Sequence, residues 1–231
     1  MKGNTMSNTE SFPVEALKEL TTCDISQALV HLGYRNGGFL SGLTMWSPER
    51  QAGTTKLIGP AYTVKYVPKD DPAPKLQSHY IESVPEGAVV FVSCPPGIPN
   101  GLWSSLVAAR GQARGAAGAI IDGRIRDLGE HRELLPTFPI FGRDTGTAPP
   151  HELVKVIAVD VPVKLASEDQ DMTIQPGDYL IGDLNGVVVL PREAAGDVVV
   201  LAKKQVEADA KMMEEIKKGM SLVEASKKFR G

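Results

Sequence analysis

Apolar residues recur at helical spacing near both ends of the chain. Between Val14 and Leu32 the apolar positions lie on one helical face, and residues with N-cap chemistry interrupt them at Thr21–Asp24. This pattern predicts two short helices, the second of which ends at Gly33. From Val198 to Lys218 apolar residues share one face with Lys and Glu opposite, which predicts a long amphipathic helix that ends at Gly219.

The middle of the chain carries short apolar runs of strand type. Ala61–Tyr66 alternates as a half-buried strand does, whereas Ala88–Val92 and Ala119–Asp122 are continuous apolar runs typical of buried strands. A helix-like stretch at Leu102–Gly115 separates the last two, so they predict a parallel β-loop-α-β crossover. Further strands are predicted at Leu57–Ile58, Pro139–Phe141 and Val154–Val163, a hairpin at Tyr179–Gly182 with Val187–Leu190, a helix at Ser78–Val84 and a loop at Asn36–Gly42.

These elements predict one α/β domain. The chain has 231 residues, and hydrophobic residues are 42% of them, which is enough to bury a sizeable core. No internal repeat, low-complexity tract or linker divides it. We therefore expect a polar, disordered lead at residues 1–12, followed by a single domain at residues 13–231.

The net charge and the length of the apolar runs argue against nucleic-acid and membrane partners. Charged residues make up 23% of the chain and the formal net charge is −3, so no overall field favours nucleic acid or an anionic membrane. No run approaches the roughly 20 apolar residues needed to cross a bilayer, and the N-terminus has no secretory h-region. Two distant cysteines, Cys23 and Cys94, fit a reducing compartment. We expect a cytoplasmic protein without nucleic-acid or membrane partners.

Most of the potentially reactive side chains lack a supporting pattern. The four histidines show no metal-ligand spacing, although His131 lies near the cluster described next. Cys94 could act as a nucleophile only with a histidine beside it. A lysine can form a Schiff base with a carbonyl substrate, but Lys56, Lys65 and other lysines stand in no distinguishing context.

Arg126 and Asp127 form the most informative polar pair. They follow the buried strand that ends at Asp122–Gly123, and α/β proteins place ligands beyond the carboxyl ends of parallel strands. The Arg126 guanidinium matches a carboxylate, and the Asp127 carboxylate suits Mg²⁺ or Mn²⁺. Ordinary loop ion pairs, for example with Glu130, are the alternative that the residues alone leave open.

The order of motifs along the chain resembles the RraA-like family. This family includes the 4-hydroxy-4-methyl-2-oxoglutarate aldolases that also decarboxylate oxaloacetate. The resemblance covers Pro13 to Phe229, is most specific at Gly115–Asp127, and has features of the eukaryotic, particularly fungal, branch at Glu130–Arg132 and Gly146–Pro150. The motifs that carry it are Gly59–Thr63, Pro85–Gly87, Arg114–Asp127, Pro176–Asp178, Gly182–Val188 and Pro191.

The resemblance implies a fold, an assembly and a site. The fold would be an α/β/β/α sandwich of the swivelling phosphohistidine-domain type, assembled as homotrimers or hexamers with active sites between subunits. Arg126 would bind a small 2-oxo acid and Asp127 would bind Mg²⁺ or Mn²⁺. Backbone amides at Ser104, Ser105, Leu106 and Val107, at the start of a helix, would hold the substrate's oxygens.

One position departs from the family pattern. The aldolases place an acidic residue twenty-one positions before the arginine, and this chain has Ser105 there. Serine can hydrogen-bond a water but supplies no negative charge, so metal binding or proton transfer would be weaker. A neighbouring subunit would contribute an acid from its C-terminal helix, and Glu207 and Asp209 are both candidates.

The implied activity is a metal-dependent, class II-type lyase reaction. Aldol cleavage and oxaloacetate decarboxylation both leave a pyruvate enolate, so one site could perform both. The alternative is a non-catalytic regulatory protein, since bacterial relatives bind and inhibit ribonuclease E, and Ser105 favours it. A methyltransferase function, which is sometimes attached to the family, is disfavoured because Gly97–Gly101 is a poor glycine-rich turn for a methyl donor.

Overall fold

The computed structural model describes residues 14–230, so the expected lead at residues 1–12 lies outside the described residues. Two helices open the fold, α1 (Glu15–Lys18) and α2 (Thr22–His31). Thr21 and Asp24 form a capping box at the start of α2, in which each side chain accepts the other's backbone N–H. The two predicted helices are confirmed, although α2 ends two residues before Gly33.

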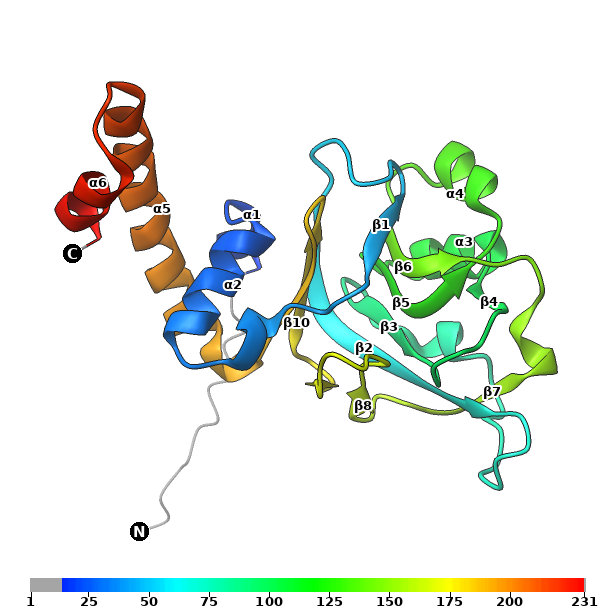
Figure 1. Ribbon diagram of the computed structural model, residues 1–231. Coiled ribbons are helices and arrows are strands. Elements are labelled where there is room, and N and C mark those ends of the chain that lie inside the picture. The colour runs from blue at the N-terminus through cyan, green and yellow to red at the C-terminus, as the bar shows by residue number, and fades with distance from the viewer. Residues whose placement is uncertain (1–13, 231) are drawn as a thin grey trace, which may run out of the picture.

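A nine-stranded mixed sheet forms the body of the molecule (Figure 1). The path runs β1-β6-β5-β3-β2-β10-β11, while β4 pairs with β5 and β7 pairs with β2. The strands are β1 (Thr44–Ser47), β2 (Leu57–Pro68), β3 (Val89–Ser93), β4 (Gly101–Trp103), β5 (Gly118–Ile125), β6 (Ile140–Thr145), β7 (Val154–Val159), β10 (Tyr179–Asp183) and β11 (Gly186–Leu190). Two short strands, β8 (Val163–Lys164) and β9 (Thr173–Ile174), pair separately.

The centre of the sheet is parallel, as the apolar runs predicted. β3 pairs with β2 on one side and with β5 on the other, both in parallel. Its side chains alternate between two cores, with Val90 and Val92 in one and Val89 and Phe91 in the other. The continuous apolar run is therefore explained by burial on both faces. The predicted hairpin is also confirmed as the antiparallel pair β10–β11.

The segment after β3 differs from its prediction. Leu102 and Trp103 belong to β4, and helix α3 begins only at Ser105 (Ser105–Ala113). Trp103 is completely buried and its ring stacks on Phe138 with centroids 6.4 Å apart, so packing overrides the helical composition here. The remaining short helices are η1 (Arg35–Gly38), η2 (Tyr80–Ser83), η3 (Pro150–Glu152), η4 (Arg192–Ala194) and α4 (Leu128–Leu134).

Two other predictions were incomplete. The alternating segment Val154–Val163 is broken at Asp160, whose φ of 54° ends β7 before the short strand β8. At the C-terminus, Gly219 separates α5 (Ala195–Lys217) from a further helix, α6 (Leu222–Phe229), which the pattern did not predict.

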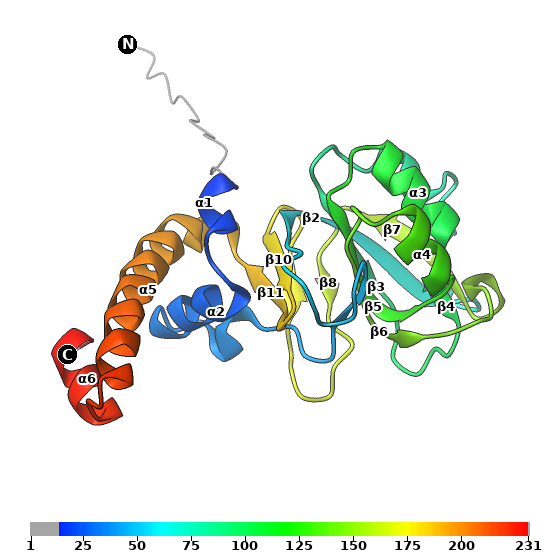
Figure 2. The same ribbon diagram turned by 90° about the horizontal axis from the view of Figure 1, so that it is seen from above.

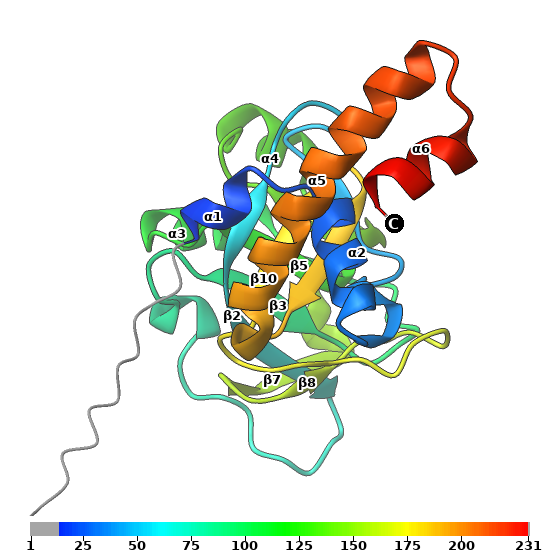
Figure 3. The same cartoon turned by 90° about the vertical axis from the view of Figure 1, so that its left-hand side faces the viewer.

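Helices α2 and α5 pack together over β10 and β11, at the opposite end of the molecule from α3 and α4 (Figures 1 and 2). Their shared core includes Ile25, Leu29, Ile181 and Val198, all fully buried. Beyond it, the second half of α5 and all of α6 extend away from the sheet (Figure 3). Within residues 14–230, no helix combines the length and apolar character that a membrane span requires.

Candidate functional site

Arg126 is held where β5 leaves the sheet. Its backbone N–H donates to the Trp103 carbonyl of β4 at 2.9 Å, which fixes the direction of the chain after Ile125. Its side chain runs across Gly101, where an added Cβ would lie 2.9 Å from the Arg126 Cβ. Gly101 is thus required by the close approach of the arginine and not by its own backbone conformation.

Replacing Gly101 by Ala is expected to displace Arg126 and to weaken the binding of a small carboxylate anion about tenfold, because the clash involves the base of the side chain and not its flexible end. Calorimetric titration with a small 2-oxo acid measures this. Gly129→Ala is the matched control, since nothing lies within 4 Å of an added Cβ there. An unchanged affinity in Gly101→Ala would show that the arginine tolerates displacement.

Asp127 occupies an unusual backbone conformation at the start of α4. Its φ of 62° and ψ of 38° lie in the left-handed region, which Asp and Asn tolerate better than most residues. The Asp127 carboxylate meets the start of α3, where it accepts the Ser105 backbone N–H. Arg126 Nε donates to Asp127 Oδ1 at 3.2 Å, and the two side chains are 30% and 25% exposed. The pair is therefore partly shielded but open to a small molecule.

Ser105 connects two carboxylates. Its backbone N–H donates to Asp127 Oδ2 at 3.2 Å, and its hydroxyl lies 3.5 Å from the same oxygen. The hydroxyl also donates to Glu130 Oε2 in a short hydrogen bond. Glu130 was considered from the sequence only as an ion-pair partner. Its position three residues after Asp127 was the available signal, because that spacing places two side chains on one face of a helix.

The first turn of α3 faces this cluster. Ser104 is the N-cap residue, and its side chain makes no cap hydrogen bond. The Ser105 amide is engaged by Asp127, whereas the amides of Leu106 and Val107 are in the first turn, where N–H groups find no acceptor within the helix. Such groups attract anions. The Leu106 side chain is 81% exposed, so it leaves the surface above the turn open.

His131 lies behind the pair and is fully buried. Its backbone N–H donates to the Asp127 carbonyl at 3.1 Å. Burial lowers the pKa of the His131 imidazole, and the Arg126 backbone, Asp127 and Glu130 oppose this shift only in part. The ring is therefore neutral near pH 7 and supports the turn from the core side.

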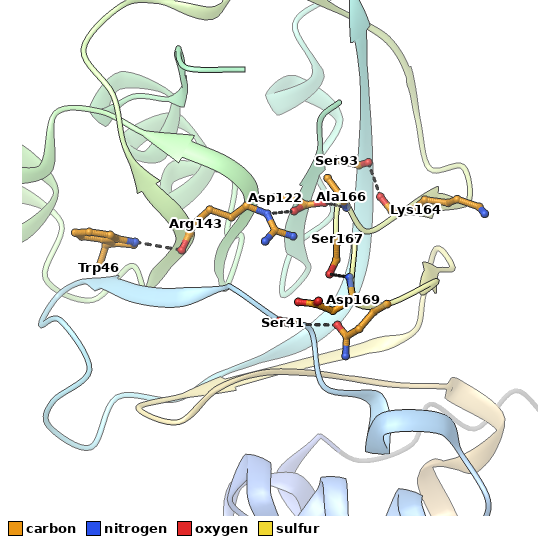
Figure 4. A network of polar contacts seen from close by, with 11 residues as sticks. Ser41, Trp46, Ser93, Asp122, Arg143, Lys164, Ala166, Ser167 and Asp169 are labelled. Atoms are coloured by element: carbon orange, nitrogen blue, oxygen red, sulfur yellow. Dashed lines mark hydrogen bonds and ion pairs between the residues drawn. The ribbon is translucent and has the colours of Figure 1, made fainter. Parts of the chain in front are cut away.

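A buried ion pair braces the strands that carry the site (Figure 4). Arg143 Nε on β6 donates to Asp122 Oδ1 on β5 at 2.6 Å, and the Ala166 N–H donates to the other Asp122 oxygen. The Asp122 side chain is completely buried. Burial raises the pKa of the Asp122 carboxyl, although its hydrogen bonds and Arg143 lower it.

Asp122→Asn is expected to lower the free energy of unfolding by about 3 kcal/mol, because it leaves Arg143 uncompensated and sets an amide donor against the Ala166 N–H. Urea denaturation measures the change. Asp171→Asn removes an exposed pair with Lys164 and should leave the midpoint unchanged. Equal midpoints for both variants would show that the buried pair contributes nothing.

The other residues that the sequence offered for catalysis or metal binding are unreactive or lie on other elements. Cys94 is buried, and burial together with Asp122 raises the pKa of its thiol to about 12, so it does not serve as a nucleophile near neutral pH. Asp209 is engaged by Arg230, whose Nε donates to Asp209 Oδ1 at 2.6 Å. Glu207 is exposed on α5. Both acids belong to α5, which lies at the opposite end of the molecule from α4, the helix that follows Arg126 (Figure 1).

The donor set around Ser105 fits a hard divalent cation. It offers carboxylate oxygens from Asp127 and Glu130 and one hydroxyl. Mg²⁺ and Mn²⁺ commonly take one or two protein carboxylates and fill the other positions with water or substrate oxygens. Within residues 14–230, no group of three or more His, Cys, Asp or Glu side chains is placed to hold a metal. Asp127 and Glu130 would thus be the carboxylates of such a site, with water or substrate oxygens at its remaining positions.

The family model named RraA-like (Aldolase/RraA) matches residues 22–189. The chain belongs to the RraA-like family. A protein of Halalkalibacterium halodurans, provisionally named 4-hydroxy-4-methyl-2-oxoglutarate aldolase, is 31% identical over 150 residues, covering 65% of this chain and 67% of that protein. These matches confirm the family that the motifs indicated, while its eukaryotic branch stays a prediction.

Two further comparisons are with a longer protein and with a solved structure. Protein DlpA of Legionella pneumophila is 28% identical over 188 residues, and these span 79% of this chain but 28% of DlpA. The structure of Streptomyces coelicolor RraAS2, described as an unusual member of the RNase ES inhibitor RraA family, is 29% identical. It superposes with a TM-score of 0.72 over 87% of this chain and 96% of that chain. The mixed α/β fold is thus shared with this RraA protein.

Proposed function

We propose that this protein is a divalent-metal-dependent lyase that releases pyruvate from small 2-oxo acids. The candidate substrates are 4-hydroxy-4-methyl-2-oxoglutarate or a related 4-hydroxy-2-oxo acid, together with oxaloacetate. The observation that carries the proposal is the Arg126–Asp127 pair, partly exposed beside the first turn of α3. The provisional aldolase name of the Halalkalibacterium relative supports it.

Each group of the site has a role in this reaction. The Arg126 guanidinium binds the substrate's carboxylate and 2-oxo oxygens, and the amides of Leu106 and Val107 bind further oxygens. In aldol cleavage the C4 hydroxyl gives its proton to solvent and becomes a carbonyl as the C3–C4 bond breaks. The electron pair of that bond passes into the enolate of pyruvate, which then takes up a proton from solvent at C3. Decarboxylation of oxaloacetate breaks the corresponding bond with loss of carbon dioxide. Arg126 stabilises the negative charge that develops in both cases.

Asp127 and Glu130 would hold Mg²⁺ or Mn²⁺, with Ser105 orienting the two carboxylates. When bound, the cation polarises the 2-oxo group and offsets negative charge. Glu130 supplies the acidic side chain that the family places at position 105. Ser105 connects Glu130 to Asp127, since its hydroxyl donates to Glu130 and its backbone N–H donates to Asp127. The negative charge is therefore kept, although it comes from a different helix.

We further propose that the active unit is a homotrimer or hexamer of single-domain chains with the swivelling phosphohistidine-domain type of sandwich. Glu207 is the better candidate to reach a neighbouring site, because Asp209 is paired with Arg230. Helices α5 and α6 together form an arm that carries Glu207. This arm exposes apolar side chains that a second subunit could cover. They are Val200, Met213, Leu222 and Val223, each more than half exposed.

A regulatory function is the second candidate. Ser105 supports it, as does the similarity to RraAS2, whose family is described by inhibition of RNase ES. In that case the exposed apolar arm would contact another protein, and the absence of a nucleic-acid partner stays a prediction.

Pyruvate release from oxaloacetate and from 4-hydroxy-4-methyl-2-oxoglutarate tests the proposal. The purified protein is assayed with Mg²⁺, with Mn²⁺ and with EDTA, and Arg126→Ala serves as the inactive reference. Metal-dependent release that Arg126→Ala loses is the expected result. A folded protein that releases no pyruvate from either substrate with either metal would contradict the proposal and favour the regulatory function.

A further inference from the structure

A cavity of about 280 Å³ lies away from Arg126 and Asp127, between the loop that follows β2, η3 and the start of β7. This loop projects beside β7 at the edge of the sheet (Figure 1). None of the residues that line the cavity belongs to the proposed active site. Its chemistry is therefore independent of the lyase proposal.

Two lysines, Lys75 and Lys155, give the cavity its positive charge, whereas burial lowers the pKa of the His79 imidazole. Its lining includes Lys75, His79, His151 and Lys155, and no Asp or Glu. This is opposite in sign to the protein as a whole, whose formal net charge is −3. A concave surface with one sign of charge concentrates ligands of the other sign.

The acids Glu82 and Asp71 near the cavity have other partners. Arg110 binds the Glu82 carboxylate through its Nε and one Nη, with Nε 3.1 Å from Oε1. The Asp71 carboxylate accepts the Ala73 N–H at 2.8 Å. The Asp71 backbone carbonyl accepts from Lys155 Nζ at 2.5 Å. Lys155 is thereby tethered, which reduces the entropy that it would lose on binding a ligand.

His79 is arranged to donate a hydrogen bond. Its Nδ1 accepts the Ile81 N–H at 3.3 Å, so the neutral ring carries its proton on Nε2. The ring stacks on Tyr80 with centroids 4.5 Å apart and an interplanar angle of 28°. This contact fixes the plane of the imidazole at the wall of the cavity.

Aromatic and aliphatic side chains form the apolar wall. Tyr66 and Tyr80 are buried and meet edge to face, with centroids 6.2 Å apart and planes at 74°. Only a small part of each ring lines the cavity, because the two are 8% and 3% exposed and His79 covers one face of Tyr80. The rest of the apolar wall comes from Leu76, Pro150, Val154 and Val156. Ligand pockets commonly combine such a surface with a few charged groups that fix orientation.

We propose that this cavity binds a small oxyanion carried on a flat aromatic ring, either an aromatic carboxylate or an aromatic phosphate. The ring packs against the apolar wall, and the oxyanion accepts hydrogen bonds from Lys75, Lys155 and His79. The volume admits a single ring with one charged group.

Isothermal titration calorimetry of the full chain with benzoate, phenyl phosphate, benzamide and inorganic phosphate tests this site. Benzoate or phenyl phosphate is expected to saturate one site per chain, and the tighter of the two identifies the oxyanion. Benzamide, which lacks the charge, and inorganic phosphate, which lacks the ring, should each bind at least about tenfold more weakly. Equal binding of benzamide, or of inorganic phosphate, would overturn the proposal, as would the absence of saturation by both aromatic anions.

Substitutions of the cavity lysines test where the aromatic anion binds. Lys75→Gln combined with Lys155→Gln should weaken the aromatic anion at least about tenfold, whereas Lys211→Gln, at an exposed lysine on α5, should not. Because Lys155 also tethers a loop, Lys75→Gln alone provides a second test that leaves this tether intact. Arg126→Ala should retain the affinity. If Arg126→Ala abolishes binding and the lysine variants do not, the anion occupies the proposed active site and the inference is wrong.

Discussion

Asp127→Asn is expected to lower metal-dependent pyruvate release at least about a thousandfold, which corresponds to about 4 kcal/mol of transition-state stabilisation. Asn has nearly the shape of Asp and also tolerates the left-handed region, so the turn at φ 62° should persist. The substitution removes the negative charge that would bind the cation. Steady-state kinetics with Mn²⁺, together with Mn²⁺ binding followed by electron paramagnetic resonance, measure both consequences.

Asp160→Asn is the matched control for this substitution. Asp160 also adopts a left-handed conformation, with φ of 54°, but it follows β7 and lies outside the proposed site. Its variant should keep full activity and full Mn²⁺ affinity. If Asp127→Asn binds Mn²⁺ as the parent does, Asp127 is not a metal ligand. If it also keeps its activity, the proposed role of the pair is wrong.

The central crossover could be predicted from the sequence because both of its strands are buried on two faces. Continuous apolar runs such as Val89–Val92 arise only where helices and strands cover both sides of a sheet. The position of Arg126 after β5 followed from the same reasoning, although β5 continues to Ile125, three residues past the predicted end of the strand at Asp122. The location of the site therefore depends on the order of strands and helices, which the pattern of apolar residues along the chain predicts well.

Shorter features could not be predicted because tertiary contacts decide them. The three-residue strand β4 exists because Trp103 fills a core position against Phe138, although its neighbours favour a helix. The left-handed turn at Asp127 similarly depends on contacts that no local pattern specifies. That turn and the buried strand together bring Ser105 and Glu130 into contact, which are 25 positions apart.

The second large effect is expected on Mn²⁺ binding when the carboxylate of Glu130 is removed and then supplied at position 105 instead. Glu130→Gln should weaken Mn²⁺ binding and pyruvate release by about 10- to 100-fold, because Gln still accepts the Ser105 hydrogen bond but carries no charge. Ser105→Asp in the same background returns the carboxylate to the position that the family uses. The double variant should therefore recover most of the lost Mn²⁺ affinity.

The single variant Ser105→Asp completes the cycle and distinguishes charge from shape. It would place a third carboxylate beside Asp127 and Glu130, so like-charge repulsion should lower stability in the absence of metal. Glu133→Gln is the control on the same helix, because Glu133 is exposed and should not affect binding. Mn²⁺ affinity is measured separately from activity. The proposal that Glu130 binds the metal is therefore tested independently of the proposal that the protein is a lyase. Unchanged affinity in Glu130→Gln, or no recovery in a folded double variant, would show that Glu130 does not replace the missing acid at position 105.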